Sequence, residues 1–207
     1  MGQTLATSMA NRRRDILEAA TKVFLETGYT AASIDNVAAA ANISKPTIYK
    51  YFSSKEELFE AIITDLSDGI ESDLEKMCLK NLPPQDALRT YGKSILDVLV
   101  TPDAVALYRL IIAEGGRSEA LVKNFHNCGC GPVRHILENY LQAQSAKGTL
   151  KVADPVLATW QFIGMIELPL FWRNVMRLRD ELPDEKEVNT TLESAVDVFM
   201  SAYKPAA

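Results

Sequence analysis

Basic and hydroxyl side chains gather between residues 44 and 55, and such side chains bind the phosphates and base edges of nucleic acids. Ile48 and Phe52, four residues apart, would give a short helix in this stretch its buried side. Lys45 and Thr47 fall on other faces of that helix, where they can meet a polar partner. The stretch therefore has the chemistry of a surface that contacts a polyanion.

Two short helices joined by a tight turn are predicted to position these side chains. Ser33 is a good N-cap for the first helix, whose apolar residues then recur at helical spacing. Asn42 tolerates the left-handed conformation that a tight turn needs. Ser44 can cap the second helix, and Pro46 lies in its first turn, where a missing N–H costs little. This is the helix-turn-helix plan, whose second helix enters the DNA major groove.

At these residues the sequence resembles the N-terminal domain of the TetR family of bacterial transcriptional regulators. The matches combine aromatic, lysine and small residues at fixed spacing: Gly28-Tyr29, Ser33-Ile34, Val37-Ala38, Ile43-Ser44, Thr47-Ile48-Tyr49, Tyr51-Phe52 and Lys55-Glu56-Glu57-Leu58. The resemblance covers roughly the first quarter of the chain. Asn42 stands where the family most often has Gly, and this change is sterically acceptable because Asn tolerates a positive φ.

The resemblance implies that eight residues of this domain lie at the DNA: Ser33, Ser44, Lys45, Pro46, Thr47, Tyr49, Lys50 and Lys55. Lys45 and Thr47 have the reach for base edges, and a lysine binds most naturally to guanine O6 and N7. Ser33, Tyr49 and the two later lysines would mostly hold phosphates, which fix the register without reading the sequence. A packing role in the core is the alternative for Tyr49.

The distribution of charge agrees with a DNA-binding N-terminal region. Residues 1–55 carry seven Lys/Arg and four Asp/Glu, whereas residues 56–207 carry fifteen and twenty-three, so the net charge of −5 comes entirely from the later part. This acidic remainder argues against non-specific binding of polyanions there. The surplus of three positive charges in residues 1–55 is modest, so useful affinity for DNA would require pairing with a second subunit.

Helical periodicity and its interruptions predict an all-α fold of about nine helices, and no stretch has a strand pattern. We expect a three-helix helix-turn-helix DNA-binding domain at 1–56, beginning with a flexible arm over 1–10, and a larger effector-binding and dimerisation domain at 57–207. Breaks are predicted around residues 128–132, which are rich in glycine, and near Pro169 within a long helix.

The middle of the chain resembles one branch of the TetR family, the AefR-like proteins. The matches lie between residues 107 and 155: Tyr108-Arg109, Ile112-Ala113-Glu114, Arg117, Phe125, Gly148, Leu150 and Asp154-Pro155. Family members enclose a small-molecule site between their later helices and release DNA when that site is filled. The resemblance therefore implies an unknown small-molecule effector.

Aromatic and charged residues on the middle and late helices are the candidates for that effector site: Tyr91, Tyr108, Arg109, Glu114, Phe125, Trp160, Met165, Glu167, Phe171 and Trp172. As a set they favour a largely apolar ligand with one or two polar anchors. Aromatic residues at helical spacing are also typical of a hydrophobic core, and this alternative stays open for each of them.

A homodimer is expected because one short helix in one groove rarely gives useful affinity, and such domains normally bind two related half-sites. In the TetR family the last two helices form the dimer interface. The corresponding residues here are Trp160, Ile163, Val188, Leu192, Ala195 and Phe199. Packing inside one subunit is the alternative for each residue.

Two thiols and two imidazoles near the middle of the chain suggest a second kind of regulation. His126, Cys128, Cys130 and His135 could hold a soft metal, or the thiols could sense oxidants. The C-x-C spacing is not that of a structural zinc site, whose pairs are usually C-x₂-C. The simpler interpretation is a glycine-rich break with reduced cysteines, so we expect no metal and no cofactor.

The sequence thus predicts a ligand-responsive transcriptional repressor that binds a palindromic operator in double-stranded DNA as a homodimer and is released by a small, largely apolar effector. The alternatives are a metal- or thiol-responsive regulator and a dimeric ligand-binding protein without DNA recognition. An enzyme is not expected, because the chain has two histidines and no nucleophile elbow, metalloprotease helix or phosphate loop. Without a signal peptide or a membrane-spanning stretch, we expect a cytoplasmic protein.

Overall fold

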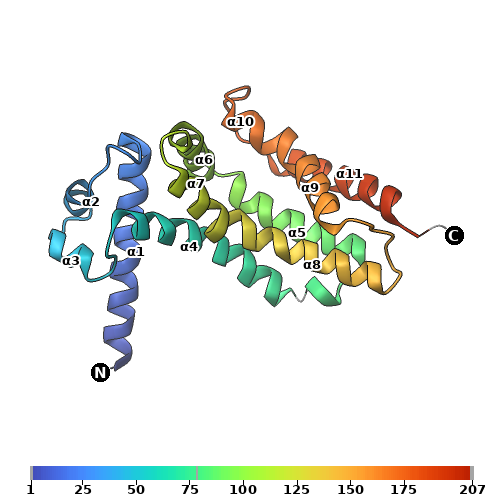
Figure 1. Cartoon of the computed structure of the whole chain (residues 1–207), viewed down its shortest axis with the longest axis horizontal. Helices are drawn as coiled ribbons and strands as arrows, with labels where there is room; N and C mark the ends of the chain where they lie inside the picture. Colours follow the sequence, from blue (N-terminus) through green and yellow to red (C-terminus); the bar gives the residue numbers. More distant parts are fainter. Residues whose placement is uncertain (1, 78, 206–207) are drawn as a thin grey trace. The chain divides into compact units, whose positions relative to one another are not determined.

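The computed structural model describes residues 2–77 and 79–205, with side chains from residue 9 onward except that of residue 66. Throughout this part of the chain the regular structure is helical and contains no strand (Figure 1), which confirms the all-α prediction. None of these helices is long and apolar enough to cross a membrane. The backbone contacts divide the chain into two compact units, described in turn.

The first unit comprises residues up to 65 together with residues 109–129. It contains α1 (Gly2–Thr27), α2 (Ile34–Ala40), α3 (Lys45–Tyr49), the start of α4 (Lys55–Lys76), the end of α6 (Pro102–Gly115) and α7 (Glu119–Phe125). Its core includes a trio of aromatic rings, in which Phe24, Tyr29 and Phe59 lie with centroids 5.1–5.9 Å apart. This trio joins α1, the following loop and α4.

Residues 2–10, which the sequence predicts to be a flexible arm, instead form the first turns of α1. The backbone gives a reason, because no glycine or proline interrupts the chain between Gly2 and the end of the helix at Thr27. The sequence also places a domain boundary after residue 56, whereas residues 109–129 join the N-terminal unit. The division of function between the two domains stays a prediction.

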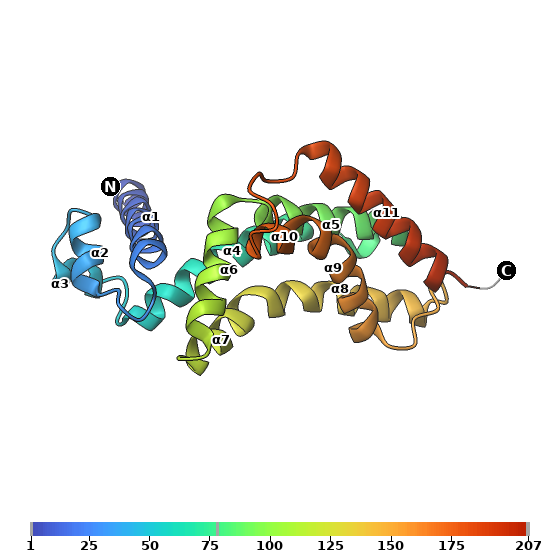
Figure 2. The same cartoon turned by 90° about the horizontal axis from the view of Figure 1, so that it is seen from above.

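The second unit comprises residues 66–108 and 130 onward. It contains a short 3₁₀ turn (Leu79–Asn81), α5 (Pro84–Leu99), α8 (Gly131–Ala146), α9 (Pro155–Glu167), α10 (Arg173–Val175) and α11 (Glu185–Tyr203). Helix α11 packs against both α5 and α9, and α9 also packs against α8 (Figure 2). Large side chains with almost no exposure fill the space between them: Leu88, Tyr91, Leu137, Phe162 and Phe199.

Two π-helical turns stand where the sequence predicts breaks. The predicted bend near Pro169 is confirmed: α9 ends at Glu167 and a π-helical turn, Leu168–Trp172, follows it. Proline has no N–H to donate and its ring crowds the preceding turn, so the helix widens there. The predicted interruption at 128–132 is instead a second π-helical turn, His126–Cys130, and α8 starts directly after it.

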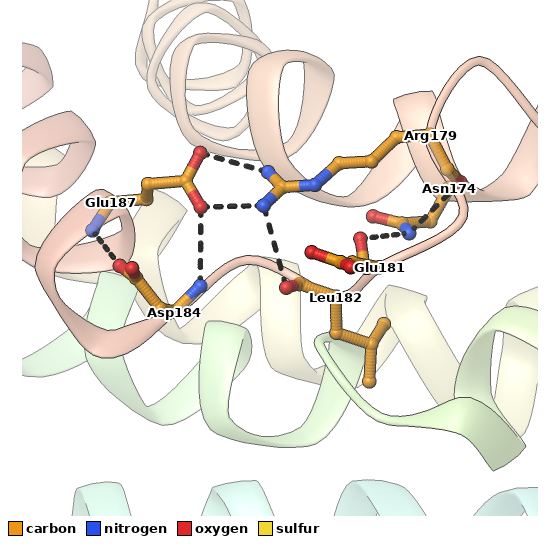
Figure 3. Close-up of polar contacts among 6 residues, drawn as sticks. All are labelled: Asn174, Arg179, Glu181, Leu182, Asp184 and Glu187. Atoms are coloured by element: carbon orange, nitrogen blue, oxygen red, sulfur yellow. Dashed lines mark hydrogen bonds and ion pairs between the residues drawn. The ribbon is translucent and has the colours of Figure 1, made fainter.

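The segment before α11 is fixed by a network of polar contacts (Figure 3). The guanidinium of Arg179 donates to both carboxylate oxygens of Glu187, at 2.9 and 2.5 Å. Asp184 caps α11 by accepting from the Glu187 amide at 2.8 Å, and the Asp184 amide donates back to Glu187. Asn174 Nδ2 donates to the carbonyl of Glu181 at 2.9 Å. These contacts fix the direction in which α11 leaves the turn.

Candidate nucleic-acid interface and ligand site

The turn between α2 and α3 has the left-handed conformation that the sequence predicts at Asn42, whose φ is 53°. The turn is closed by backbone hydrogen bonds from Asn42 to Ala39 (3.2 Å) and from Ile43 to Ala38 (3.0 Å). Ser33 caps α2 as predicted, because its hydroxyl accepts from the Asn36 amide at 3.2 Å. Local sequence alone therefore determines how α3 leaves α2.

Helix α3 buries one side and exposes the rest. Ile48 has no exposed surface and Phe52, which follows the helix, has 3%. The predicted DNA-facing residues around them are exposed, apart from the half-buried Ser33, Thr47 and Lys55: Ser44, Lys45, Pro46, Tyr49 and Lys50. Tyr49 is 48% exposed, which rules out the alternative of a core tyrosine.

Lys45 at the start of α3 forms an ion pair with Asp35 in the first turn of α2, with 2.9 Å between Nζ and Oδ2. The hydrogen bond and the charge of Asp35 raise the pKa of the Lys45 ammonium. The sequence did not identify Asp35 as a functional residue, because a separation of ten positions gives no periodic signal. Asp35 positions the Lys45 ammonium on the exposed face.

Lys55 has a structural task that the sequence did not indicate. Its ammonium donates to the carbonyls of Tyr29 (2.9 Å), Ala32 (3.1 Å) and Thr30 (3.4 Å), and it lies 4.6 Å from the centroid of the Tyr29 ring. These carbonyls belong to the loop between α1 and α2. Lys55 therefore ties that loop to the first turn of α4, and a phosphate would have to share the ammonium with it.

Glu114, predicted to line the effector site, instead belongs to the first unit. Its carboxylate accepts a hydrogen bond from the Thr30 hydroxyl, and the residue is 8% exposed. Gly28, whose φ is 83°, permits this approach, because a Cβ there would lie 3.2 Å from Glu114 Oε1. Arg109 and Phe125 also lie in the first unit. Sequence spacing could not reveal a contact between positions more than eighty residues apart.

Five of the predicted effector-site residues come together in the second unit: Tyr91, Tyr108, Glu167, Phe171 and Trp172. The rings of Tyr108 and Phe171 are 4.7 Å apart, and those of Tyr108 and Trp172 are 6.1 Å apart. Trp172 Nε1 donates to Glu167 Oε2 at 3.3 Å. Burial raises the pKa of Glu167 to about 7. This group offers an acid in apolar surroundings.

The two remaining candidates, Trp160 and Met165, line a surface groove to which Trp172 also contributes. Trp160 is 52% exposed, and the Arg134 guanidinium stacks 4.7 Å from its ring centroid. Met165 lines an apolar surface groove of about 720 Å³ between α9, the π-helical turn at Pro169 and α11. Both residues therefore lie where a ligand or a partner can reach them, and their place in an effector site stays a prediction.

Most of the predicted dimer-interface residues are instead part of the core of one subunit. Five of the six have at most 8% exposed surface: Ile163, Val188, Leu192, Ala195 and Phe199. Their spacing of three and four residues marks the side of α9 and α11 that faces the other helices of the unit. Trp160 is the exception. The apolar side chains that α9, the π-helical turn after it and α11 leave exposed are different ones: Val156, Leu157, Trp160, Leu168 and Val198.

The cysteine and histidine positions give little support to a metal or redox switch. Within the described part of the chain, no group of three or more His, Cys, Asp or Glu side chains is placed to hold a metal ion. His135 Nδ1 lies 2.5 Å from Glu138 Oε2. Burial raises the pKa of the Cys130 thiol, which disfavours the reactive thiolate.

Family models match both parts of the chain. Residues 16–62 match the model of bacterial regulatory proteins of the tetR family, and residues 86–205 match that of the AefR-like transcriptional repressor C-terminal domain. The solved structure of a TetR-family regulator from Mesorhizobium loti is 26% identical, with a TM-score of 0.78 over 95% of this chain and 98% of that chain. The flavonoid-responsive regulator FrrA is 30% identical, with a TM-score of 0.73 over 96% and 100%.

Among curated proteins, the repressor NicS of Pseudomonas putida is 28% identical over 80% of this chain and 77% of its own length. Matches to two other bacterial regulators, 44% and 34% identical, span only 38% and 40% of those proteins. The matched families and relatives are transcriptional regulators rather than enzymes. The chain therefore belongs to the TetR family of ligand-responsive, DNA-binding transcriptional regulators.

Proposed function

We propose that this chain is a homodimeric repressor that binds a palindromic operator and is released by a small, largely apolar effector. The exposed polar face of α3, held in place by the fully buried Ile48, is the observation that carries the proposal. The names of the AefR-like repressor model and of the repressor NicS support repression rather than activation. Because its target is DNA, the repressor would act in the cytoplasm.

In this proposal α3 enters the major groove with Lys45 and Thr47 toward base edges. The Thr47 hydroxyl lies 2.8 Å from that of Ser44, so the two present one polar surface at the start of the helix. Tyr49 and Lys50 on the exposed side, with Ser33 at the start of α2, hold phosphates. Asp35 can release Lys45 to the DNA readily, because solvent screens this exposed ion pair and it stabilises the domain little.

A second subunit is required because α3 is five residues long and reads only a few base pairs. Two such helices would bind half-sites about 34–36 Å apart, one turn of the DNA helix. The exposed apolar side chains of α9 and α11 supply the surface for this second copy. Helices α9 and α11 correspond to the last two long helices, which the TetR family uses for dimerisation.

The effector would act by shifting a population of conformations. In one form of the dimer the two α3 helices do not fit successive half-sites. A ligand that binds this form more tightly lowers the affinity for the operator, at most by the ratio of the ligand's affinities for the two forms. Helices α4 and α6 each have residues in both units, so they are the elements that can transmit the change. A small displacement suffices because both half-sites must be engaged together.

Selection of bound sequences from a random pool of DNA tests the proposal. The expected product is a palindrome with half-site centres about 10 base pairs apart. Lys45→Ala should weaken binding to the selected site at least tenfold and should abolish the base preference at one position of each half-site. Lys22→Ala removes the same charge from an exposed position on α1 and should leave binding unchanged.

Three results would contradict the proposal. A pool that yields no enriched sequence would favour a dimeric ligand-binding protein without DNA recognition. Enrichment of a single half-site would show that the chain does not bind its operator as a dimer. Equal effects of Lys45→Ala and Lys22→Ala would show that α3 is not the reading element.

A further inference from the structure

The carboxylate of Glu167 at the end of α9 lacks a cationic partner. It accepts one hydrogen bond, from Trp172 Nε1 at 3.3 Å, and no Lys, Arg or His side chain in the described ranges forms an ion pair with it. The π-helical turn at Pro169 explains the contact, because it brings residue 172 over residue 167. A desolvated acid without a cationic partner is costly, so its presence in the unit calls for a function.

An aromatic cluster is linked to this carboxylate through Trp172. Trp172 contacts it directly, Tyr108 lies 6.1 Å from the Trp172 ring, and Phe171 lies 4.7 Å from the Tyr108 ring. The faces of such rings are electronegative and attract ammonium groups. Tyr108 and Trp172 retain some accessible surface, as does Glu167, although desolvation raises the pKa of both Tyr108 and Glu167. A bound molecule can therefore reach these side chains without solvent competing fully.

The Tyr91 hydroxyl is a second polar group without a partner in the described part of the chain. The residue is fully buried, and its oxygen makes no hydrogen bond. Burial is the main cause of the raised pKa of Tyr91, and the charge of Glu167 raises it further, so the two groups share one electrostatic environment. Arg134, the cation whose charge also acts on Tyr91, is already engaged by Glu138 at 3.1 Å and by the Trp160 ring.

We propose that Glu167, with the rings of Tyr108 and Trp172 and the hydroxyl of Tyr91, is the polar end of the effector site and selects a hydrophobic cation. The ligand class is an aromatic or aliphatic body that carries an ammonium group. This inference rests on the proposed effector-responsive function and specifies its ligand.

The physical argument compares three ligands with the same apolar body. An ammonium group gains the charge of Glu167 and the electronegative ring faces, and both interactions are strong where water is excluded. An alcohol can donate one hydrogen bond but gains no charge interaction. A carboxylate would place a second negative charge beside Glu167 and is excluded.

Calorimetric titration of the full-length chain with 4-phenylbutylamine, 4-phenylbutan-1-ol and 4-phenylbutyrate tests the inference at pH 8. The amine should bind at least tenfold more tightly than the alcohol, and the carboxylate should not bind measurably. Glu167→Gln should lower amine affinity at least tenfold and leave alcohol affinity within twofold. Glu75→Gln, which removes the same charge from an exposed position on α4, should reproduce the wild-type ratios.

Equal affinities of the amine and the alcohol for the wild-type chain would overturn the inference, and this comparison requires no variant. An amine preference that persists in a folded Glu167→Gln chain, as judged by circular dichroism, would overturn it as well. Binding of the selected operator by the ligand-free chain is measured in parallel. Operator binding without amine selectivity refutes this inference alone, whereas amine selectivity without operator binding refutes the proposed function.

Discussion

Lys45 and Lys55 lie ten positions apart in the proposed DNA-binding region, and their surroundings assign them different tasks. Lys45 contacts one exposed carboxylate, which a phosphate or a base edge can replace. Lys55 contacts three backbone carbonyls and an aromatic ring, none of which can move without reshaping the loop between α1 and α2. We therefore regard Lys45 as a DNA-contacting residue and Lys55 first as a residue that positions the domain.

Lys55→Ala should accordingly lower stability as well as DNA affinity. Loss of charged hydrogen bonds to the loop carbonyls should cost about 1–2 kcal/mol, which lowers the melting temperature by about 2–8 °C in a chain of this size. Lys50→Ala, at an exposed position after α3, is the matched control and should melt like the wild type. If Lys55→Ala melts like the wild type but flattens the salt dependence of DNA binding by about one unit, Lys55 is chiefly a phosphate ligand.

Glu167 should make stability depend on pH in a window set by its pKa. The folded chain has a pKa of about 7 at Glu167, above the ordinary value of 4.5, because burial disfavours the charge. The folded chain thus keeps a proton that the unfolded chain has already released, so stability falls as the pH rises from 4.5 through 7. Tyr91, Tyr108 and Cys130 interact electrostatically with Glu167. Their own pKa values are raised, so these three groups stay neutral in this pH range.

Melting curves of the wild type and Glu167→Gln between pH 5 and pH 8 check this expectation. The melting temperature of the variant, relative to that of the wild type, should rise by about 5–10 °C between pH 5 and pH 8. A constant difference across the range would show that Glu167 stays ionised and paired in the folded chain.

At the scale of elements, local signals in the sequence predicted the structure well where one residue type dictates a backbone conformation. Asn42 marks the left-handed turn, Ser33 caps α2, and the helix bends at Pro169, directly after α9. Amphipathic spacing predicted that α11 has an apolar side but not what covers it. The same spacing suits a core and an interface, so it could not show that Leu192 and Phe199 are buried within one subunit.

Asn42→Ala tests whether the turn depends on this residue type. A side chain with a Cβ but no local hydrogen-bonding group should cost about 1 kcal/mol at a φ of 53°, and the melting temperature should fall by about 2–4 °C. Asn42→Gly removes the conformational strain and should melt within about 1 °C of the wild type. Equal melting of the alanine and glycine variants would show that the turn tolerates any residue.

At the scale of the whole molecule, the sequence predicted the fold class and the exposed face of α3 but not which distant segments pack together. Residues 109–129 join the N-terminal unit, and the contact of Thr30 with Glu114 spans 84 positions. A contact of this kind depends on tertiary packing, which has no periodic signature in one chain. A family resemblance therefore predicts the positions of the helices more reliably than it predicts which side chains line a site.

The proposed dimer concerns the whole molecule, and its surface can be tested through the side chains that the fold leaves exposed. Leu157 on α9 and Val198 on α11 are 52% and 54% exposed and contribute nothing to the core of one subunit. Leu157→Glu combined with Val198→Glu should weaken self-association at least a hundredfold, because buried unpaired carboxylates are costly. Sedimentation should then give 22.9 kDa rather than twice that mass.

Val122→Glu provides the control, since Val122 is also an exposed apolar residue, 41% accessible, but lies on α7 in the other unit. It should leave the dimer and operator binding intact. The double variant should keep its helical content and lose operator binding, because two half-sites must be engaged together for useful affinity. A double variant that remains dimeric, or a wild-type chain that sediments as a monomer at operator-binding concentrations, would separate α9 and α11 from DNA recognition.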